Sequence, residues 1–523
     1  MTRDLTSDST DFDRYFDQYR SSQSRDWWDD DPILQCLIAR GASDSAASVT
    51  ENLAQLSPEI STDFRHLADE GARVENLPQV RHFNAYRERI DEVILPTVTR
   101  ELMSRIYMAR PFHKDLNPWE LYGRLYLLSQ LGEAGVMCSL ACTDGMVQLL
   151  RRFADTPPLK TILSKLENGD EGRFYHAAQF VTEIQGGSDA ATNVLSAQPE
   201  TGGYRLYGNK WFCSNITADY FVVTARPQGA PAGASGVALF AVPAYDEKTG
   251  ARNGYRIDRI KNKLGTQSLP TVELTFDGAV AYPIGPLHKG LSNVVSIVLT
   301  TSRLHCALTN AAFLRQAYRQ ARHYANFRQA FGQPIAEFPL IKQGLRDLED
   351  ASTRLVTGTF DILSRQLALA AASRGDAASS PEHARKLYVL RILIMLNKVH
   401  VSREASERIH QAISIFGGNG IEEEWSSVPR LLRDAIINEV WEGPHSLLIT
   451  RSLLDLENGP LTPAQFVDDA LVSAPQEVKA AITDELDAVL HIPQTEEKTI
   501  AFAEWAARFS THFQRSAMRR LAR

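Results

Sequence analysis

Two short runs combine hydroxyl groups with glycine or an aromatic ring, and such side chains can hold a planar or anionic ligand. Residues 180–189 (FVTEIQGGSD) place Thr182 at the end of an expected strand, and Gly187 and Ser188 in the turn that follows. Glycine lets backbone amides approach such a ligand, and a hydroxyl at a strand end can hydrogen-bond a ring carbonyl. An ordinary Gly-Gly turn would also explain this run by itself. Residues 208–215 (GNKWFCSN) add an aromatic ring and a hydroxyl on the next strand pair.

Further runs later in the chain carry arginine, glycine and a carboxylate. They are RQAFGQPI at residues 328–335, FGGNG at 416–420, RD at 433–434 and VWEG at 440–443. The chain has no GxGxxG fingerprint after a strand and no GxxxxGK[ST] loop. A Rossmann dinucleotide site and a P-loop are therefore not expected.

Composition limits the class of protein. A chain of 523 residues that is 44% hydrophobic and 23% charged is long enough for several packed domains and too apolar for bulk disorder. The net charge of −7 argues against a protein that works mainly by coating nucleic acid. Residues 1–25 are polar and acidic, and no stretch of about 18 consecutive apolar residues occurs. We expect a soluble cytoplasmic protein that does not enter a membrane.

The cysteines point to a reduced intracellular protein. They are odd in number, scattered and without a CxxC pair, so no metal site is expected. Cys138 and Cys142, which share a helix face, and Cys213 are expected to pack in the core. The full set is Cys36, Cys138, Cys142, Cys213 and Cys306.

The hydrophobic pattern predicts helices at both ends of the chain and strands between them. It is predicted to be helical from residue 57 to about 150, through closely spaced apolar residues at Val93, Leu95 and Val98 and with Leu121, Leu125 and Leu128 four and three apart. Long helices are expected later, and Ser380 with Pro381 suits the start of the third. The expected strands are 177–182, 204–207, 220–225, 237–242 and 271–276, and the expected long helices are 291–330, 336–374, 381–416 and 445–456.

These elements predict a mainly α protein with one β domain. The expected units are an N-terminal helical domain (1–176), an antiparallel β-sandwich or barrel (177–288), an antiparallel four-helix bundle (289–457) and an extra C-terminal helical domain (458–523).

In this order and with these separations, the runs resemble those of the acyl-CoA dehydrogenase flavoproteins over residues 121–456. Within that superfamily the TExQGGSD, KWFxS and WEG runs and the added C-terminal domain look like the adaptive-response AidB-type branch. The resemblance implies an acyl-CoA dehydrogenase-like fold, FAD as cofactor, and an acyl-CoA or acyl-thioester as substrate.

The resemblance also implies roles for residues around the flavin. Thr182 would hydrogen-bond the pyrimidine edge, Phe212 would wall the ring, and Arg328 would reach the FAD pyrophosphate of a neighbouring subunit. A shared cofactor implies a homo-oligomer, either a dimer or a tetramer. The expected cofactor contacts are Thr182, Gly187, Ser188, Phe212, Ser214, Arg328, Phe331, Ser414, Gly417, Gly418, Trp441 and Gly443, and the expected substrate contacts are Arg303, Ser188 and Trp441.

By the same resemblance Glu442 is the expected catalytic base, which removes the substrate α-proton while the β-hydrogen leaves as hydride to flavin N5. Such a proton is too weakly acidic unless the enolate is stabilised, here by hydrogen bonds from the flavin ribityl and the Glu442 backbone amide. Burial is expected to raise the Glu442 pKa. Some relatives carry the base on the first bundle helix, where residues 301–303 offer no carboxylate. A glutamate that only caps the helix near His445 is the alternative.

Two positions depart from the family pattern. Pro444 and His445 replace the usual hydroxyl after Glu-Gly, and Ser414 stands where glutamine is common. Both positions help to hold FAD, so cofactor affinity or substrate shape is expected to differ. His445 either tunes the base or is simply the first residue of a helix.

Two other functions stay open. An AidB-type role in the alkylation response, with DNA binding and little dehydrogenase activity, would rest on residues 461–523. There seven basic side chains face nine acidic ones, and only the helix from Arg508 on is basic. A flavin oxidase or monooxygenase on a nitro- or amino-compound is the third reading, although a glutamate at position 442 argues against it. The electron acceptor, an electron-transfer flavoprotein or oxygen, is left open.

Overall fold

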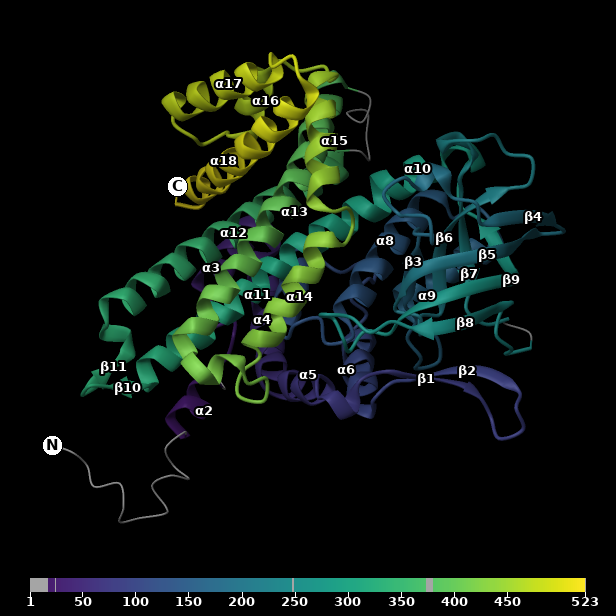
Figure 1. Cartoon of the computed structure of the whole chain (residues 1–523), viewed down its shortest axis with the longest axis horizontal. Coiled ribbons are helices and arrows are strands. Elements are labelled where there is room, and N and C mark those ends of the chain that lie inside the picture. The colour runs from purple at the N-terminus through teal and green to yellow at the C-terminus, as the bar shows by residue number, and fades with distance from the viewer. Residues whose placement is uncertain (1–16, 24, 247–248, 373–379, 523) are drawn as a thin grey trace, which may run out of the picture.

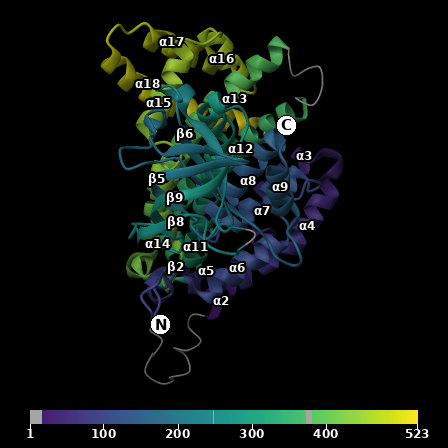
Figure 2. The same ribbon diagram turned by 90° about the vertical axis from the view of Figure 1, so that its right-hand side faces the viewer.

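The computed structural model describes residues 17–522 except 24, 247–248 and 373–379. The described chain places a β domain on one side and long helices on the other, with N-terminal helices beneath both (Figure 1). The last helices lie across one end of the long ones. Figure 2, turned by 90°, shows the β domain in front of the helical part. Any expectation about residues 1–16 lies outside the described residues.

The N-terminal part is helical, as predicted, but it also contains a hairpin that the helical pattern missed. Strands β1 (Gln79–Phe83) and β2 (Arg89–Ile94) pair antiparallel, and Val93, which was expected in a helix, pairs with Val80. Both valines pack on the core of the β domain, so a tertiary contact outweighs the local spacing. The helices are α2 (Asp17–Gln23), α3 (Pro32–Gly41), α4 (Ala46–Glu59), α5 (Arg65–Gly71), α6 (Thr97–Met108), α7 (Pro118–Ser129), α8 (Met137–Phe153) and α9 (Pro157–Asn168).

The β domain is a closed barrel of five strands with two more attached. Strand β6 pairs with β4, then β4 with β5, β5 with β9, β9 with β7, and β7 again with β6. The five expected strands are all present, and β4 and β8 are additional. Two pairings, β3–β6 and β4–β6, are parallel and the others are antiparallel. The strands are β3 (Ala177–Phe180), β4 (Ser196–Glu200), β5 (Gly203–Ser214), β6 (Tyr220–Pro227), β7 (Ala238–Pro243), β8 (Tyr255–Ile260) and β9 (Thr271–Pro283).

The bundle is built around one long helix. It comprises α10 (Gly290–Asn293), a π-helical segment (Val294–Leu299) and α11 (Thr300–Phe327), without a break. The stretch Leu287–Phe327 is long and apolar enough to cross a membrane. Nearly every α11 side chain, however, is buried against α7, α8 and the other bundle helices, as in the core of a folded protein.

The remaining bundle helices are α12 (Pro339–Ala372), α13 (Pro381–Phe416), α14 (Val428–Val440) and α15 (His445–Glu457), with a small hairpin, β10 (Gln329–Ala330) and β11 (Gln333–Pro334), before α12. The Ser380 hydroxyl caps α13 by accepting from the His383 amide, which confirms that start. The predicted 445–456 helix is present as α15. Helix α14, which was not expected, packs on α11 and α13, while α15 packs on α13 and α18.

Three C-terminal helices pack on the outside of the bundle. They are α16 (Pro463–Ala470), α17 (Gln476–Leu490) and α18 (Thr495–Ala522), around a core of Phe466, Trp505 and Phe509. Helix α18 lies along α12, where Gln514 accepts from Arg354 at 2.7 Å and Arg520 pairs with Asp361. This packing accounts for the extension as part of the folded body of the chain.

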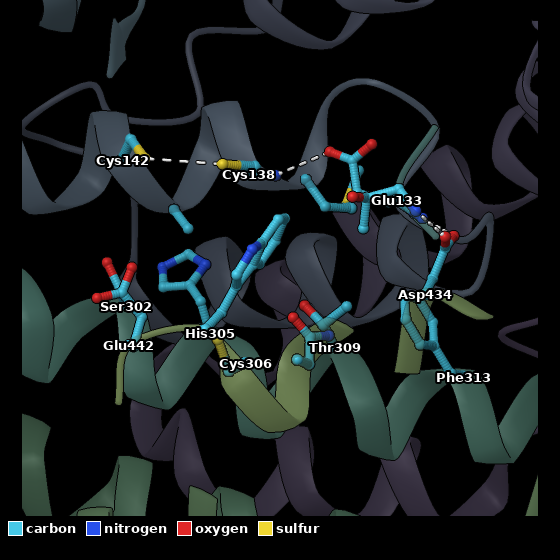
Figure 3. A pocket seen from close by; sticks show the side chains of 15 residues that line it. Glu133, Cys138, Cys142, Ser302, His305, Cys306, Thr309, Phe313, Asp434 and Glu442 are labelled. Carbon is cyan, nitrogen blue, oxygen red and sulfur yellow. Dashed lines mark hydrogen bonds between the residues drawn. The ribbon is translucent and has the colours of Figure 1, made fainter. Parts of the chain in front are cut away.

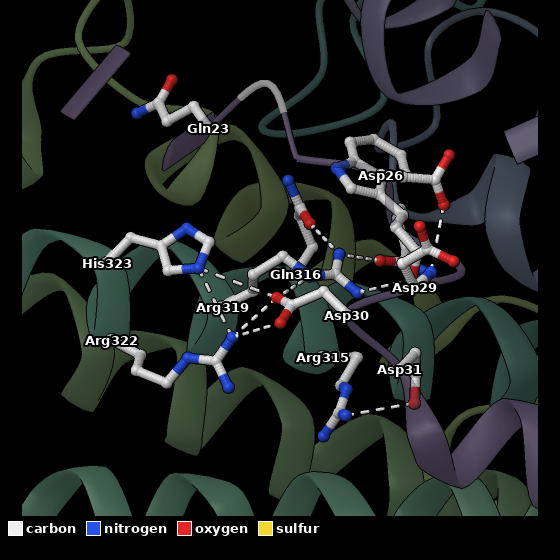
Figure 4. A network of polar contacts seen from close by, with 12 residues as sticks. Gln23, Asp26, Asp29, Asp30, Asp31, Arg315, Gln316, Arg319, Arg322 and His323 are labelled. Atoms are coloured by element: carbon white, nitrogen blue, oxygen red, sulfur yellow. Dashed lines mark hydrogen bonds and ion pairs between the residues drawn. The ribbon is translucent and has the colours of Figure 1, made fainter. Parts of the chain in front are cut away.

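A buried ionic network joins the N-terminal segment to α11 (Figure 4). Asp30 pairs with Arg319 at 3.1 Å and with Arg322 at 2.6 Å, and Asp31 pairs with Arg315 at 3.1 Å. Burial opposes ionisation of Asp30, but the two arginines outweigh it and hold its pKa below the ordinary value. The network therefore anchors the segment before α3 to the centre of the bundle.

We predict that Asp30→Asn lowers the free energy of unfolding by about 3 kcal/mol, because the buried arginines then keep charges without their partner. The midpoint of the first transition in urea, measured at neutral pH, checks this. Since the Asp30 pKa is lowered on folding, its contribution is present above pH about 4 and fades as the pH falls through the folded-state pKa. Asp44→Asn, on an exposed turn, is the control. An Asp30→Asn loss no larger than the control's contradicts the prediction.

Candidate functional site

The turn between α14 and α15 carries Glu442 in a conformation that non-glycine residues rarely adopt. Glu442 has φ 57° and Gly443 has φ 107°, so two successive residues lie at positive φ. Such a conformation costs a non-glycine residue about 1 kcal/mol or more and persists only where the surroundings impose it. Pro444 is the N-cap of α15 and no side chain caps that helix, so Glu442 is not a capping residue.

Side chains from two other elements hydrogen-bond to Glu442. From β3, Gln179 Nε2 donates to Oε1 at 2.7 Å, and from α11, Arg303 Nε donates to the Glu442 carbonyl at 2.9 Å. Burial raises the pKa of Glu442 above its ordinary value, and Arg303, Lys398 and Gln179 offset part of that rise. A carboxyl group with a raised pKa in a cavity wall is the arrangement that general-base chemistry uses.

Glu442 opens onto a narrow cavity between α8, α11 and α14 (Figure 3). Its volume is only about 30 Å³, and it opens in part to solvent. Figure 3 shows Glu442 and Glu133 at opposite ends. The lining residues are Glu133, Met137, Cys138, Ala141, Cys142, Thr266, Ser302, His305, Cys306, Thr309, Phe313, Asp434, Asn438, Trp441 and Glu442.

The thiols of Cys138 and Cys142 line this cavity, which corrects the expectation that they only pack in the core. Their sulfur atoms lie 3.9 Å apart, and Cys306 faces them across the cavity. Contact with Cys142 and burial raise the Cys138 pKa, and burial raises that of Cys306 to about 12. The Cys138 and Cys306 thiols therefore stay protonated and form apolar wall, and they do not act as nucleophiles. Cys213 is buried in the β domain, as expected.

Several lining residues were missed by sequence reasoning. His305 Nε2 lies 2.8 Å from Asp144 Oδ2 in the cavity wall. At the far end, burial raises the pKa of Glu133 to about 7, while Lys263 opposes and Asp434 adds to that rise. A signal existed, because the α11 residues of the lining recur at three- and four-residue spacing from Ser302 to Phe313 and so share one helix face.

The β domain presents the first two sequence runs side by side. The Trp211 amide donates to the Thr182 carbonyl at 3.0 Å, and the Thr182 hydroxyl has no partner among the described residues. Phe212 is 56% exposed, which is unusual for a large aromatic ring on a strand. A Cβ at Gly187 would meet the Thr182 Oγ1 at 2.4 Å, so glycine is required there. Ser188 is exposed in the same turn, and Ser214 contacts Thr271 at 2.9 Å.

A buried ion pair that sequence reasoning missed joins these two runs. Lys210 Nζ donates to Glu183 Oε1 at 2.8 Å, to the Val181 carbonyl at 3.0 Å and to Thr224 Oγ1 at 3.1 Å. Glu183 also accepts from the Val194 and Leu195 amides. The pair fixes the backbone on either side of Thr182.

The other expected cofactor residues lie at the opposite end of α11. Arg328 ends that helix, and Phe331 is 98% exposed in the hairpin that follows. Tyr324 stacks on Phe416 with ring centroids 4.7 Å apart, which places the end of α13 beside the end of α11. Ser414, Gly417 and Gly418 are exposed there, and an added Cβ at either glycine would meet no atom within 4 Å.

This second group is far from Glu442 within one chain. Arg303 and Arg328 are separated by 25 positions along one helix, or about 37 Å at 1.5 Å per residue. That distance exceeds the diameter of a small domain. One cofactor molecule therefore does not contact both groups in the same chain.

Three further residues named from the sequence lie close to Glu442. Trp441 lines the cavity beside Glu442. Arg303, which is predicted to contact substrate, directs its Nε to the Glu442 carbonyl and is not among the residues that line the cavity. His445 begins α15, its Nε2 lies 3.3 Å from Ser402 Oγ, and burial lowers its pKa to about 4, so it is neutral and outside the cavity lining.

The basic C-terminal helix is partly neutralised. Arg508 pairs with Glu485 at 3.0 Å, and Arg520 pairs with Asp361. Nothing in the described residues favours DNA binding over packing for this helix.

Solved structures share this arrangement. ACDH-11 of Caenorhabditis elegans, in complex with C11-CoA, superposes with a TM-score of 0.85 at 26% identity, covering 95% of this chain and 87% of that one. An acyl-CoA dehydrogenase complexed with FAD from Bacillus anthracis superposes with a TM-score of 0.67 at 19% identity, covering 81% and 77%. The second likeness concerns the fold alone.

Sequence relatives and family models agree with the fold. Acyl-CoA dehydrogenase family member 11 of Caenorhabditis elegans is 30% identical over 438 residues, which cover 80% of this chain and 69% of that protein. The putative acyl-CoA dehydrogenase AidB of Escherichia coli is 28% identical over 437 residues, covering 80% and 75%. Residues 17–170 match the AidB N-terminal domain, 178–279 the acyl-CoA dehydrogenase middle domain and 288–452 the acyl-CoA dehydrogenase C-terminal domain. The chain therefore belongs to the acyl-CoA dehydrogenase family of FAD-using oxidoreductases that act on CH–CH groups, with an N-terminal domain of the AidB type.

Proposed function

We propose that this protein is an acyl-CoA dehydrogenase in which Glu442 removes the α-proton of an acyl thioester. The observation that carries the proposal is the placement of Glu442 at one end of a cavity, with a raised pKa and no role as a helix cap. A carboxylate whose pKa lies closer to the working pH is a stronger base while it remains ionised.

The residues of the chain fit FAD. The open Thr182 hydroxyl, the exposed Phe212 ring and the close turn at Gly187 form a surface for a planar ring on the β domain. Gln179, three residues before Thr182, already contacts Glu442, so a ring held there lies near the base. When bound, FAD supplies the acceptor for the substrate β-hydride. The chain itself holds the ring and the base, and takes the α-proton on Glu442.

The shape of the cavity supports a linear acyl chain as the substrate class. Its α11 wall extends from Ser302 to Phe313, which is about 16 Å at 1.5 Å per residue. Most of the surface that the whole cavity exposes is apolar, with Met137, Cys138 and Phe313 among the side chains, although serine, histidine and threonine also line the α11 side. The relative ACDH-11 was solved with C11-CoA, which is consistent with a chain of medium length.

We predict that a medium-chain acyl-CoA bleaches the bound flavin in the absence of oxygen, and that Glu442→Gln slows this step by about 10²- to 10⁴-fold, the contribution of a general base. Stopped-flow absorbance of the flavin band measures it. Because the Glu442 pKa is raised, the rate should fall as the pH drops through a value above the ordinary glutamate pKa of about 4.3.

Glu382→Gln serves as the matched control for that experiment, because this glutamate lies exposed in the first turn of α13 and does not line the cavity. If no acyl-CoA of any chain length or branching bleaches the flavin, or if both variants lose activity equally, Glu442 is not the base.

We further propose that the active protein is a homo-oligomer in which the second group of residues completes the cofactor site of a neighbouring subunit. The distance along α11 separates the two groups within one chain. Large apolar side chains are also exposed at that end, namely Phe331 (98%), Leu340 (87%) and Ile421 (75%). Such a patch is typical of a protein interface.

We expect Phe331→Asp to give a smaller particle that has lost most of its FAD, since a carboxylate would then face the interface. Mass photometry and the ratio of flavin to protein absorbance are the measurements. Ile500→Asp, at an exposed apolar residue on α18 of the C-terminal extension, should change neither. A Phe331→Asp protein of unchanged mass with full FAD would show that this end of the bundle is not the interface.

A further inference from the structure

A fully buried lysine contacts the turn that carries Glu442. Lys398 lies on α13 with 0% of its surface exposed. Its Nζ donates to the Glu439 carbonyl at 2.9 Å and to the Gly443 carbonyl at 2.8 Å. In the described part of the chain no carboxylate oxygen lies within 4.0 Å of this ammonium group, so it is held by carbonyls and not by an ion pair.

Such burial is costly for an ammonium group, and it lowers the pKa of Lys398 to about 8 even though Cys306 and Glu442 favour its charged form. An apolar side chain would fill the same space without this cost. The position of the two accepting carbonyls explains what the lysine contributes, because one lies before Glu442 and the other directly after it.

The turn is held from two sides. Arg303 on α11 donates to the Glu442 carbonyl, and Lys398 on α13 donates to the Glu439 and Gly443 carbonyls. Glu442 and Gly443 both have positive φ, so the turn needs such outside contacts to persist. The last carbonyls of α14 have no partner within the helix, and a cation is the favoured group at that end.

We infer that Lys398 is a positioning residue for Glu442: it holds the strained turn in place, and its positive charge favours the ionised carboxylate. The inference rests on the proposed function, in which Glu442 is the base. Lys398 does not touch substrate in this account and acts through Glu442.

The charged and titratable groups around Glu442 define the electrostatic effect. They are Arg303 and Cys306 from α11, Lys398 from α13, and Glu439 and His445 on the flanks of the turn, while β3 contributes the neutral Gln179. His445 is neutral above pH about 4, and the thiol is protonated. Only Arg303 and Lys398 therefore lower the Glu442 pKa by their charge. Because burial raises this pKa, removal of either cation should raise it further.

The test is the titration of Glu442 in the FAD-loaded protein without substrate. Infrared difference spectroscopy follows the protonated carboxyl band, which is assigned by its loss in Glu442→Gln. We expect Lys398→Met to raise the midpoint by about one pH unit or more, the size of shift that a single nearby charge produces. The midpoint in Lys398→Arg should stay within a few tenths of a pH unit of the wild-type value. Lys386→Met, on the exposed face of the same helix, is the matched control.

A kinetic measurement gives the second readout. The acid limb of the kcat profile should move upward with the carboxyl band, while KM for acyl-CoA changes little. Lys398→Gln, which keeps a donor without the charge, should show the same shift and covers the case in which the methionine variant does not fold. The inference is overturned if the midpoint of the carboxyl band is unshifted in both Lys398→Met and Lys398→Gln, or if these variants lose kcat equally at every pH. Because the infrared titration needs no turnover, its outcome is independent of whether any acyl-CoA bleaches the flavin.

Discussion

The burial of α11 is the constraint on which the rest of the structure depends. This helix is covered by α7, α8, α12, α13 and α14, and most of its side chains are buried, charged ones included. Each buried charge must then find a partner from another element. Arg303 donates to the carbonyl of Glu442 in the turn before α15, and Arg319 pairs with Asp30 in the N-terminal segment. One helix therefore connects the cavity, the AidB-type domain and, at Arg328, the exposed end of the bundle.

The ionisation of Glu442, the proposed base, depends on a balance of opposing electrostatic effects. Burial disfavours the charged carboxylate of Glu442, whereas two cations that bond to its own turn favour it. The same contacts impose the positive φ that aims the side chain into the cavity. Geometry and acidity are thus set by one set of hydrogen bonds, so a change in the supporting helices alters both together.

Most of the architecture follows from local pattern. The helix 381–416 was predicted with the bounds that the structure has, because Ser380 and Pro381 begin it and Gly417, at φ 62°, ends it. The β1–β2 hairpin and the place of α14 were not predictable in this way. Val80 and Val93 are strand residues because the barrel core lies beneath them, and α14 is a bundle helix because α11 and α13 leave room for it. Neither fact is present in the spacing of apolar residues.

The sequence alone determined the family, the order of the runs and the choice of Glu442, because these depend on residue types at short spacing along the chain. The tertiary structure decided which residues contact Glu442 and its turn. Gln179 and Arg303 lie 263 and 139 positions from Glu442, and Lys398 lies 41 and 45 positions from Glu439 and Gly443, so no local pattern joins them. The cavity also has this origin, since its walls come from three helices. Burial by distant segments raises the Glu442 pKa, on which its proposed role as the base rests.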